Sequence, residues 1–173
     1  LLIVLGSTKW LSPYIDPFLN SYGKYIRIGI LILSFATLGL LIFPEFINPK
    51  ETGEWALELL WILLFIPIFA KVFNQSLAKK FIPWRKELGI LMGMLGLVHG
   101  LQYFAFGGLI TNLLDSSFWI AGFQMPFFIA GLAAVIISTT LLVTSNLYSQ
   151  IKMKKYWKML HRLVYPLLIL VIL

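Results

Sequence analysis

The chain has 173 residues, of which 60% are hydrophobic and 12% are charged, and its mean hydropathy is +0.89. These values lie far outside the range of a soluble domain and predict an integral membrane protein. The absence of cysteine excludes thiolate-ligated haem, cysteine-ligated iron–sulfur clusters, covalently attached haem and disulfide bonds.

Five apolar runs of membrane-spanning length follow one another. A helix needs about 20 residues to cross about 30 Å of hydrocarbon. The predicted spans are residues 25–43, 55–73, 88–106, 126–144 and 156–173. The sequence therefore predicts an all-α, polytopic transmembrane helical bundle. A sixth span is expected in the full protein, because the chain begins without methionine and ends on bare aliphatic residues, as a fragment would.

Residues 1–24 precede the first span. Gly6, Pro13 and Pro17 predict that any helix is broken here, so we expect an interfacial segment or the remnant of a truncated element. Residues 25–173 are expected to form the transmembrane domain.

Lysine and arginine are enriched in every second connecting segment. They concentrate before the first span and in the segments 71–87 and 145–158, whereas Lys50 is the only base in the opposite loops. By the positive-inside rule the N-terminus is expected to be cytoplasmic. The net charge of +7 thus reflects topology rather than nucleic-acid binding. Anionic lipid and haem propionates are its expected partners.

Glu54 and Glu58 lie four residues apart at the start of the second span. Carboxylates that reach water at the outer boundary are the simpler interpretation, and a proton or ligand site is the alternative. Further along this span, Pro67 lacks an N–H group and predicts a kink.

A stripe of small residues marks the third span. Its four glycines fall within about 60° of one another on a helix, which admits a close neighbouring helix; they are Gly89, Gly93, Gly96 and Gly100. Beside the stripe, Arg85, Met92 and His99 recur at intervals of seven, which places His99 about 21 Å along the axis from Arg85.

The segment 107–125 is amphipathic, and its Phe118 and Trp119 suit an outer interfacial position. Pro126 is suited to the first position of the fourth span. Hydroxyl residues at the end of that span, among them Thr144, can bond to their own helix or to a neighbour.

The two histidines, His99 and His161, both lie inside apolar segments. An ionisable group in a membrane helix is a candidate functional residue, and neutral imidazole is a good axial ligand for haem iron. The alternative is a structural histidine satisfied by a backbone carbonyl. His161 stands near the cytoplasmic start of its span and His99 about 18 Å into its own, so they are expected to serve different haems.

Several motifs occur in one order along the chain: T-G-x-W-A-L at 52–57, R-K-x-L-G-x9-H at 85–99, P-F-F-x-x-G at 126–131, T-S at 144–145 and W-x-x-x-H-R-L-V-Y at 157–165. Together they resemble the ferric-reductase-like transmembrane domain from Thr52 onward. Within that family, they are most similar to the haem-binding membrane subunits of bacterial methionine sulfoxide reductase systems.

The resemblance implies two b-type haems. His99 would ligate the outer one with a histidine expected at position 174, and His161 the inner one. Arg85 and Lys86 match a basic pair that could hold haem propionates. Glu58 stands where the family often has a basic residue, so the resemblance assigns that position no role.

The resemblance implies electron transfer across a bacterial inner membrane. The donor would be a cytosolic flavin reductase or a C-terminal flavin domain carrying FMN or FAD. The acceptor at the outer face would be a methionine sulfoxide reductase partner or ferric iron. A quinone-reacting cytochrome b is an alternative within the redox class. A non-redox transporter or structural membrane subunit with incidental histidines is the alternative outside it.

Overall fold

The computed structural model describes residues 2–42, 48–72, 80–106 and 115–172. Within these ranges all regular secondary structure is helical, which confirms the all-α prediction. In chain order the elements are α1 (Leu2–Ala36), α2 (Gly39–Ile42), α3 (Pro49–Val72), the 3-10 helix η1 (Ile82–Trp84), α5 (Arg85–Phe106), α6 (Ser116–Phe123), α7 (Pro126–Val143), α8 (Leu147–Met153), α9 (Lys155–Leu160), the 3-10 helix η2 (His161–Leu163) and α10 (Val164–Ile172).

Three helical segments in the described residues are long and apolar enough to cross a membrane, namely Pro17–Leu41, Pro49–Val72 and Pro126–Val143. They correspond to the first, second and fourth predicted spans, and the chain is an integral membrane protein. The helix of the third span, α5, is 22 residues long and begins with Arg85, Lys86 and Glu87. The total of five spans stays a prediction.

The fifth predicted span is not one continuous α-helix. It is divided into α9, η2 and α10, with the 3-10 turn beginning at His161. Pro166 explains the interruption, because it has no N–H group and its ring crowds the carbonyl of Arg162 four residues earlier. His161 therefore lies at a junction between helices rather than within a regular α-helix.

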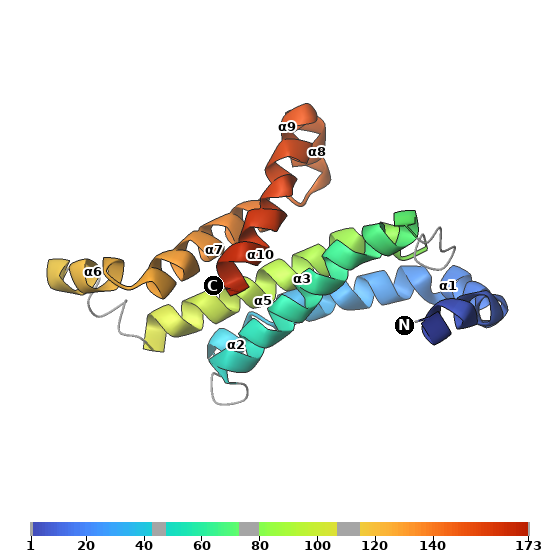
Figure 1. Ribbon diagram of the computed structural model, residues 1–173, viewed down its shortest axis with the longest axis horizontal. Coiled ribbons are helices and arrows are strands. Elements are labelled where there is room, and N and C mark those ends of the chain that lie inside the picture. Colours follow the sequence, from blue (N-terminus) through green and yellow to red (C-terminus); the bar gives the residue numbers. More distant parts are fainter. Residues whose placement is uncertain (1, 43–47, 73–79, 107–114, 173) are drawn as a thin grey trace.

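Helix α1 runs from Leu2 to Ala36 through both Pro13 and Pro17, so the predicted break is a bend within one assigned helix (Figure 1). The interfacial position of residues 1–24 stays a prediction. An isolated proline removes one backbone bond, and a membrane helix tolerates this where local adjustment satisfies the freed group. The dark-blue end of α1 bends back in Figure 1, as expected for a helix that contains prolines.

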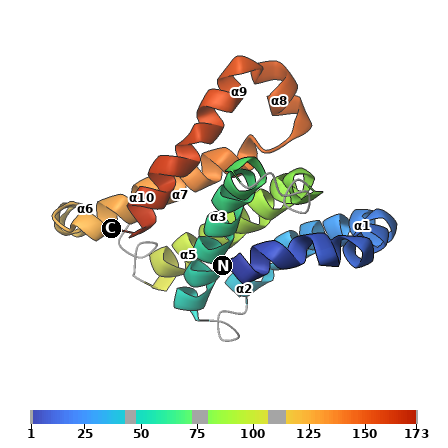
Figure 2. The same ribbon diagram turned by 45° about the vertical axis from the view of Figure 1, so that its right-hand side comes forward.

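Helix α5 is the centre of the bundle and packs against α3, α1 and α7. Figure 1 shows α3 lying along α5, with α1 on one side and α7 with α10 on the other. The core cluster joins side chains from α3, α5, α7 and α10; its buried members are Leu60, Leu63, Leu64, Met92, Leu141 and Leu167. The α8–α9 hairpin projects beyond this bundle (Figure 2).

A partly buried ion pair fastens α1 to α5. Arg27 Nε donates to Glu87 Oε1 at 2.9 Å, and a second guanidinium nitrogen reaches the same oxygen. The Glu87 side chain is only 5% exposed, and its other carboxylate oxygen is buried with no partner in the part of the chain that the structure describes. Because a buried carboxylate is costly when unpaired, Arg27 ties the N-terminal helix to the central one.

Cysteine labelling tests the predicted orientation. Gln124, before α7, and Lys155, at the start of α9, are both exposed. A membrane-impermeant thiol reagent should label Gln124→Cys on intact cells, and Lys155→Cys only after permeabilisation, because the basic segments are expected on the cytoplasmic side. The reverse pattern would contradict an N-inside topology.

Candidate functional site: two histidine cavities

His99 projects from α5 towards the first turn of α3. Its Nδ1 lies 2.8 Å from the carbonyl oxygen of Pro49. A carbonyl can only accept, so Nδ1 carries the proton and the neutral ring keeps its lone pair on Nε2. This contact is the one expected of the structural alternative, a histidine satisfied by a backbone carbonyl, and it is also the kind of bond that orients metal-ligating histidines. His99 also packs edge-on against Tyr103, with ring centroids 4.9 Å apart.

Gly53 gives the His99 ring its space. A Cβ atom at position 53 would lie 2.5 Å from Cε1 of His99 and 2.6 Å from Nδ1. No side chain fits at that distance, so a glycine is required wherever the imidazole approaches α3 this closely. The T-G pair at 52–53 is therefore part of the His99 site.

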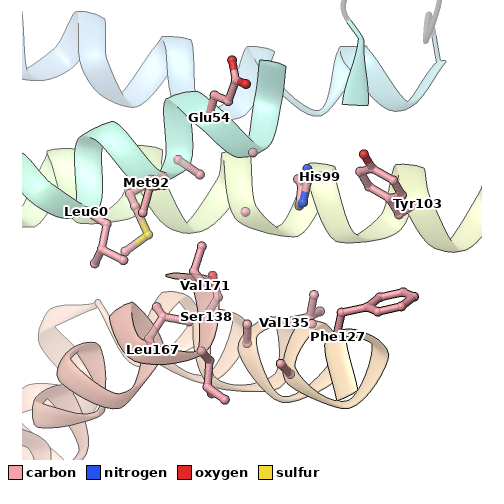
Figure 3. Close-up of a pocket in the computed structure, with 18 of the residues that line it drawn as sticks. Glu54, Leu60, Met92, His99, Tyr103, Phe127, Val135, Ser138, Leu167 and Val171 are labelled. Carbon is pink, nitrogen blue, oxygen red and sulfur yellow. The ribbon is translucent and has the colours of Figure 1, made fainter. Parts of the chain in front are cut away.

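A cavity of about 440 Å³ opens beside His99, between α3, α5, α7 and α10. Figure 3 shows the imidazole entering it from one side, with Val135 and Ser138 of α7 and Leu167 and Val171 of α10 facing it. We call it the outer cavity, after the side on which the predicted orientation would place it. Its walls are mostly apolar. Lys50 and Glu54 are charged side chains in its lining, and Nζ of Lys50 lies 3.6 Å from Oε1 of Glu54. The Ser138 hydroxyl is buried there, with no hydrogen-bond partner in the ranges that the structure describes.

A second cavity of about 390 Å³, the inner cavity, lies beside His161. Four basic side chains line it: Arg85, Lys86, Lys158 and Arg162. The Nε atom of Arg85 is buried with no partner among the described residues. The cavity therefore combines one imidazole with a concentration of positive charge, which suits an anionic ligand.

His161 is already engaged in a contact between helices. Its Nε2 lies 3.3 Å from the Thr144 hydroxyl, and its ring stacks on Trp157 with centroids 4.1 Å apart. The Thr144 hydroxyl gives its proton to the Thr140 carbonyl at 2.7 Å, so it accepts from His161. To ligate a metal through Nε2, this imidazole would have to turn away from Thr144.

The structure separates the predicted site residues into two groups. His99 lines the outer cavity, whereas Arg85, Lys86 and His161 line the inner one, and Met92 borders both. Glu54 lines the outer cavity, and Glu58 is exposed and lines neither. Residues 107–114 of the predicted interfacial segment lie outside the described residues, as does the side chain of Phe118.

The glycine stripe faces α7, as its spacing predicts. A Cβ at Gly93 would lie 3.2 Å from Leu142, one at Gly96 would lie 3.2 Å from the Ser138 hydroxyl, and one at Gly100 would lie 2.5 Å from Val135. Gly89 meets nothing within 4 Å. Three of the four glycines thus allow α5 and α7 to approach closely beside the cavities.

Leucine at Gly93, Gly96 or Gly100 should separate α5 from α7. Overpacking of this kind costs about 1–3 kcal/mol, and Gly100→Leu should be the most severe because Val135 stands closest. Thermal unfolding of the purified variants measures the effect. Leu101→Phe, at a half-exposed position of the same helix, is the control. Equal melting temperatures for all four variants would show that the stripe does not support the interface.

The cavities have the size of cofactor sites, for which about 300–1,000 Å³ is typical. Among the described residues, no group of three or more histidine, aspartate or glutamate side chains could hold a bare metal ion. A planar macrocycle such as haem needs only an axial imidazole, an apolar slot for the ring and basic side chains to pair with its propionate carboxylates. The residues present fit such a group.

The model of the family described as "Ferric reductase like transmembrane component" matches residues 52–172. This chain belongs to that family. The match begins at Thr52, in the first turn of α3, and includes both histidines and all residues that line the two cavities except Lys50. No solved structure matches the chain significantly.

Curated relatives of this family member are named as haem-binding subunits of protein-methionine-sulfoxide reductase, MsrQ. The protein of Agrobacterium fabrum is 31% identical over 68% of this chain and 51% of its own length. The protein of Rhizobium meliloti is 32% identical over 65% of this chain and 49% of its own length. The protein of Polaromonas naphthalenivorans is 28% identical over 92% of this chain and 71% of its own length. The chain spans about half the length of the first two relatives.

Proposed function

We propose that this chain is the haem-carrying part of a membrane electron-transfer subunit. The observation that carries the proposal is the division of the two histidines between two cavities, which lie one after the other along α5. The relatives named as haem-binding subunits support it. When bound, b-type haem would supply a one-electron couple at each position.

In the outer cavity, His99 is the proposed axial ligand. Its proton is held on Nδ1 by the Pro49 carbonyl, so Nε2 is available. The apolar walls from α7 and α10 would exclude water.

In the inner cavity, His161 is the proposed ligand and the basic side chains are the proposed partners of the propionates. Arg85 and Lys86 come from α5, and Lys158 and Arg162 flank His161. Arginine pairs well with carboxylates because its planar fork can donate two parallel hydrogen bonds. The buried Nε of Arg85 would gain a partner in this arrangement.

The proposed path runs from a cytosolic flavin donor, through the inner and then the outer position, to an acceptor at the outer face. The donor would be a separate flavin reductase or a flavin domain carrying FMN or FAD. The relatives' names favour a methionine sulfoxide reductase as the acceptor, and the family name favours ferric iron.

Absorption spectroscopy of the purified chain tests the proposal. Protein produced with sufficient haem should show a Soret band and, after reduction, the α band of b-type haem. The double variant His99→Ala/His161→Ala should show neither, although it remains in the membrane. A colourless parent protein would instead support a transporter or structural subunit whose histidines are incidental.

A further inference from the structure

A buried polar cluster adjoins His99, and its two side chains, Thr52 and Gln102, do not line the outer cavity. Thr52 of α3 is fully buried, and Gln102 of α5 is only 1% exposed. The Thr52 hydroxyl lies 2.7 Å from the Pro49 carbonyl and 3.1 Å from Gln102 Oε1. The amide nitrogen of Gln102 reaches the Leu40 carbonyl of α2 at 3.3 Å. These contacts connect α2, α3 and α5.

The chemistry of the partners fixes the direction of each bond. The Leu40 carbonyl can only accept, so Gln102 must present its NH₂ group to α2 and its oxygen to Thr52. A threonine hydroxyl has one proton. Thr52 must therefore share that proton between the Gln102 oxygen and the Pro49 carbonyl.

The Pro49 carbonyl is also the acceptor for His99 Nδ1 at 2.8 Å. Two donors, the imidazole and the Thr52 hydroxyl, thus compete for the same acceptor, the carbonyl oxygen of Pro49. The more fully Thr52 donates to Gln102, the better an acceptor Pro49 remains for His99. Hydrogen bonding to Nδ1 raises the basicity of a ligating imidazole, and such bonds tune the potential of the metal it holds.

We propose that Thr52 and Gln102 are positioning residues that act through the Pro49 carbonyl to set the reduction potential of the haem ligated by His99. The inference rests on the proposed function. It also gives the N-terminal part of the chain a role at the site, because Leu40 lies before the residues that match the family.

The two residues should act in opposite directions. In Thr52→Val the competing donor is lost, the His99–Pro49 bond strengthens, and the more basic ligand stabilises ferric iron, so the potential falls. In Gln102→Leu the Thr52 proton goes entirely to Pro49, the His99 bond weakens, and the potential rises. A purely structural effect of lost packing would not produce opposite signs.

The test is a redox titration of the purified full chain, followed at the spectral component that His99→Ala removes. Each substitution should change the ratio of reduced to oxidised haem at the parent midpoint by about threefold to tenfold, where tenfold corresponds to about 59 mV for a one-electron couple. Thr52→Ser, which keeps the hydroxyl, should retain the parent potential. Gln102→Met, a flexible apolar side chain of similar length, serves if Gln102→Leu does not fold.

Shifts of the same sign, or no shift in protein that retains its haem, would overturn the inference while leaving the proposed function intact. A parent chain that contains no haem would overturn the proposed function itself. A shift confined to the component that His161→Ala removes would also count against the inference, because Thr52 and Gln102 do not line the inner cavity.

Discussion

Replacing His99 with alanine should remove one of two haem components from the absorption spectrum and leave the other, with total haem falling by about half. His161→Ala should remove the second component and leave the first. The reason is geometric: the imidazoles line different cavities, so neither can replace the other as a ligand. Haem per protein, measured together with low-temperature spectra that resolve the two α bands, gives the result.

Leu101→Ala is the matched control for His99→Ala, because Leu101 lies on the same helix and is 39% exposed. It should retain both components. Added imidazole should restore the lost component of His99→Ala by occupying the space of the missing ring. If each histidine substitution abolishes the same single haem and leaves none, the assignment of one haem to each cavity is wrong.

Gly53→Val should reproduce the spectrum of His99→Ala without touching the histidine. The new Cβ would lie 2.5 Å from Cε1 of His99, so either the ring leaves its position or α3 separates from α5. In both cases the Pro49–Nδ1 bond is broken, and the component assigned to His99 should be lost. The component assigned to His161 should remain, because Gly53 does not line the inner cavity.

Gly29→Val in α1 provides the control for Gly53→Val, since a Cβ at position 29 meets nothing within 4 Å. Both changes introduce the same β-branched residue into a helix, and they differ in what the side chain meets. Full haem content in Gly53→Val would show that His99 does not need its close approach to α3.

Local periodicity predicted those parts of the fold that depend on one helix at a time. The glycine stripe of α5 faces a neighbour as its spacing requires, and Pro126 begins α7 as expected. The seven-residue spacing placed Arg85 and His99 about 21 Å apart along α5, and in the structure they line different cavities. A regular helix fixes such relations without knowledge of its partners.

Contacts between distant segments could not be predicted in this way. The carbonyl of Pro49 holds His99 across 50 positions of sequence, and Gln102 reaches Leu40 across 62. A backbone carbonyl carries no sequence signal, and Thr52 and Gln102 are common residue types whose meaning comes only from their burial. The interruption at His161 did have a local signal in Pro166, whose effect on the carbonyl of Arg162 could have been anticipated.

Met92 is buried at 7% exposure and lines both cavities. The two cavities therefore share this side chain in their walls, and we expect substitutions on either side of it to combine non-additively. Its flexible thioether can adapt to a change in one cavity by moving into the other. The same position is chemically vulnerable, because oxidation to the sulfoxide would place a polar group in the wall of both sites at once.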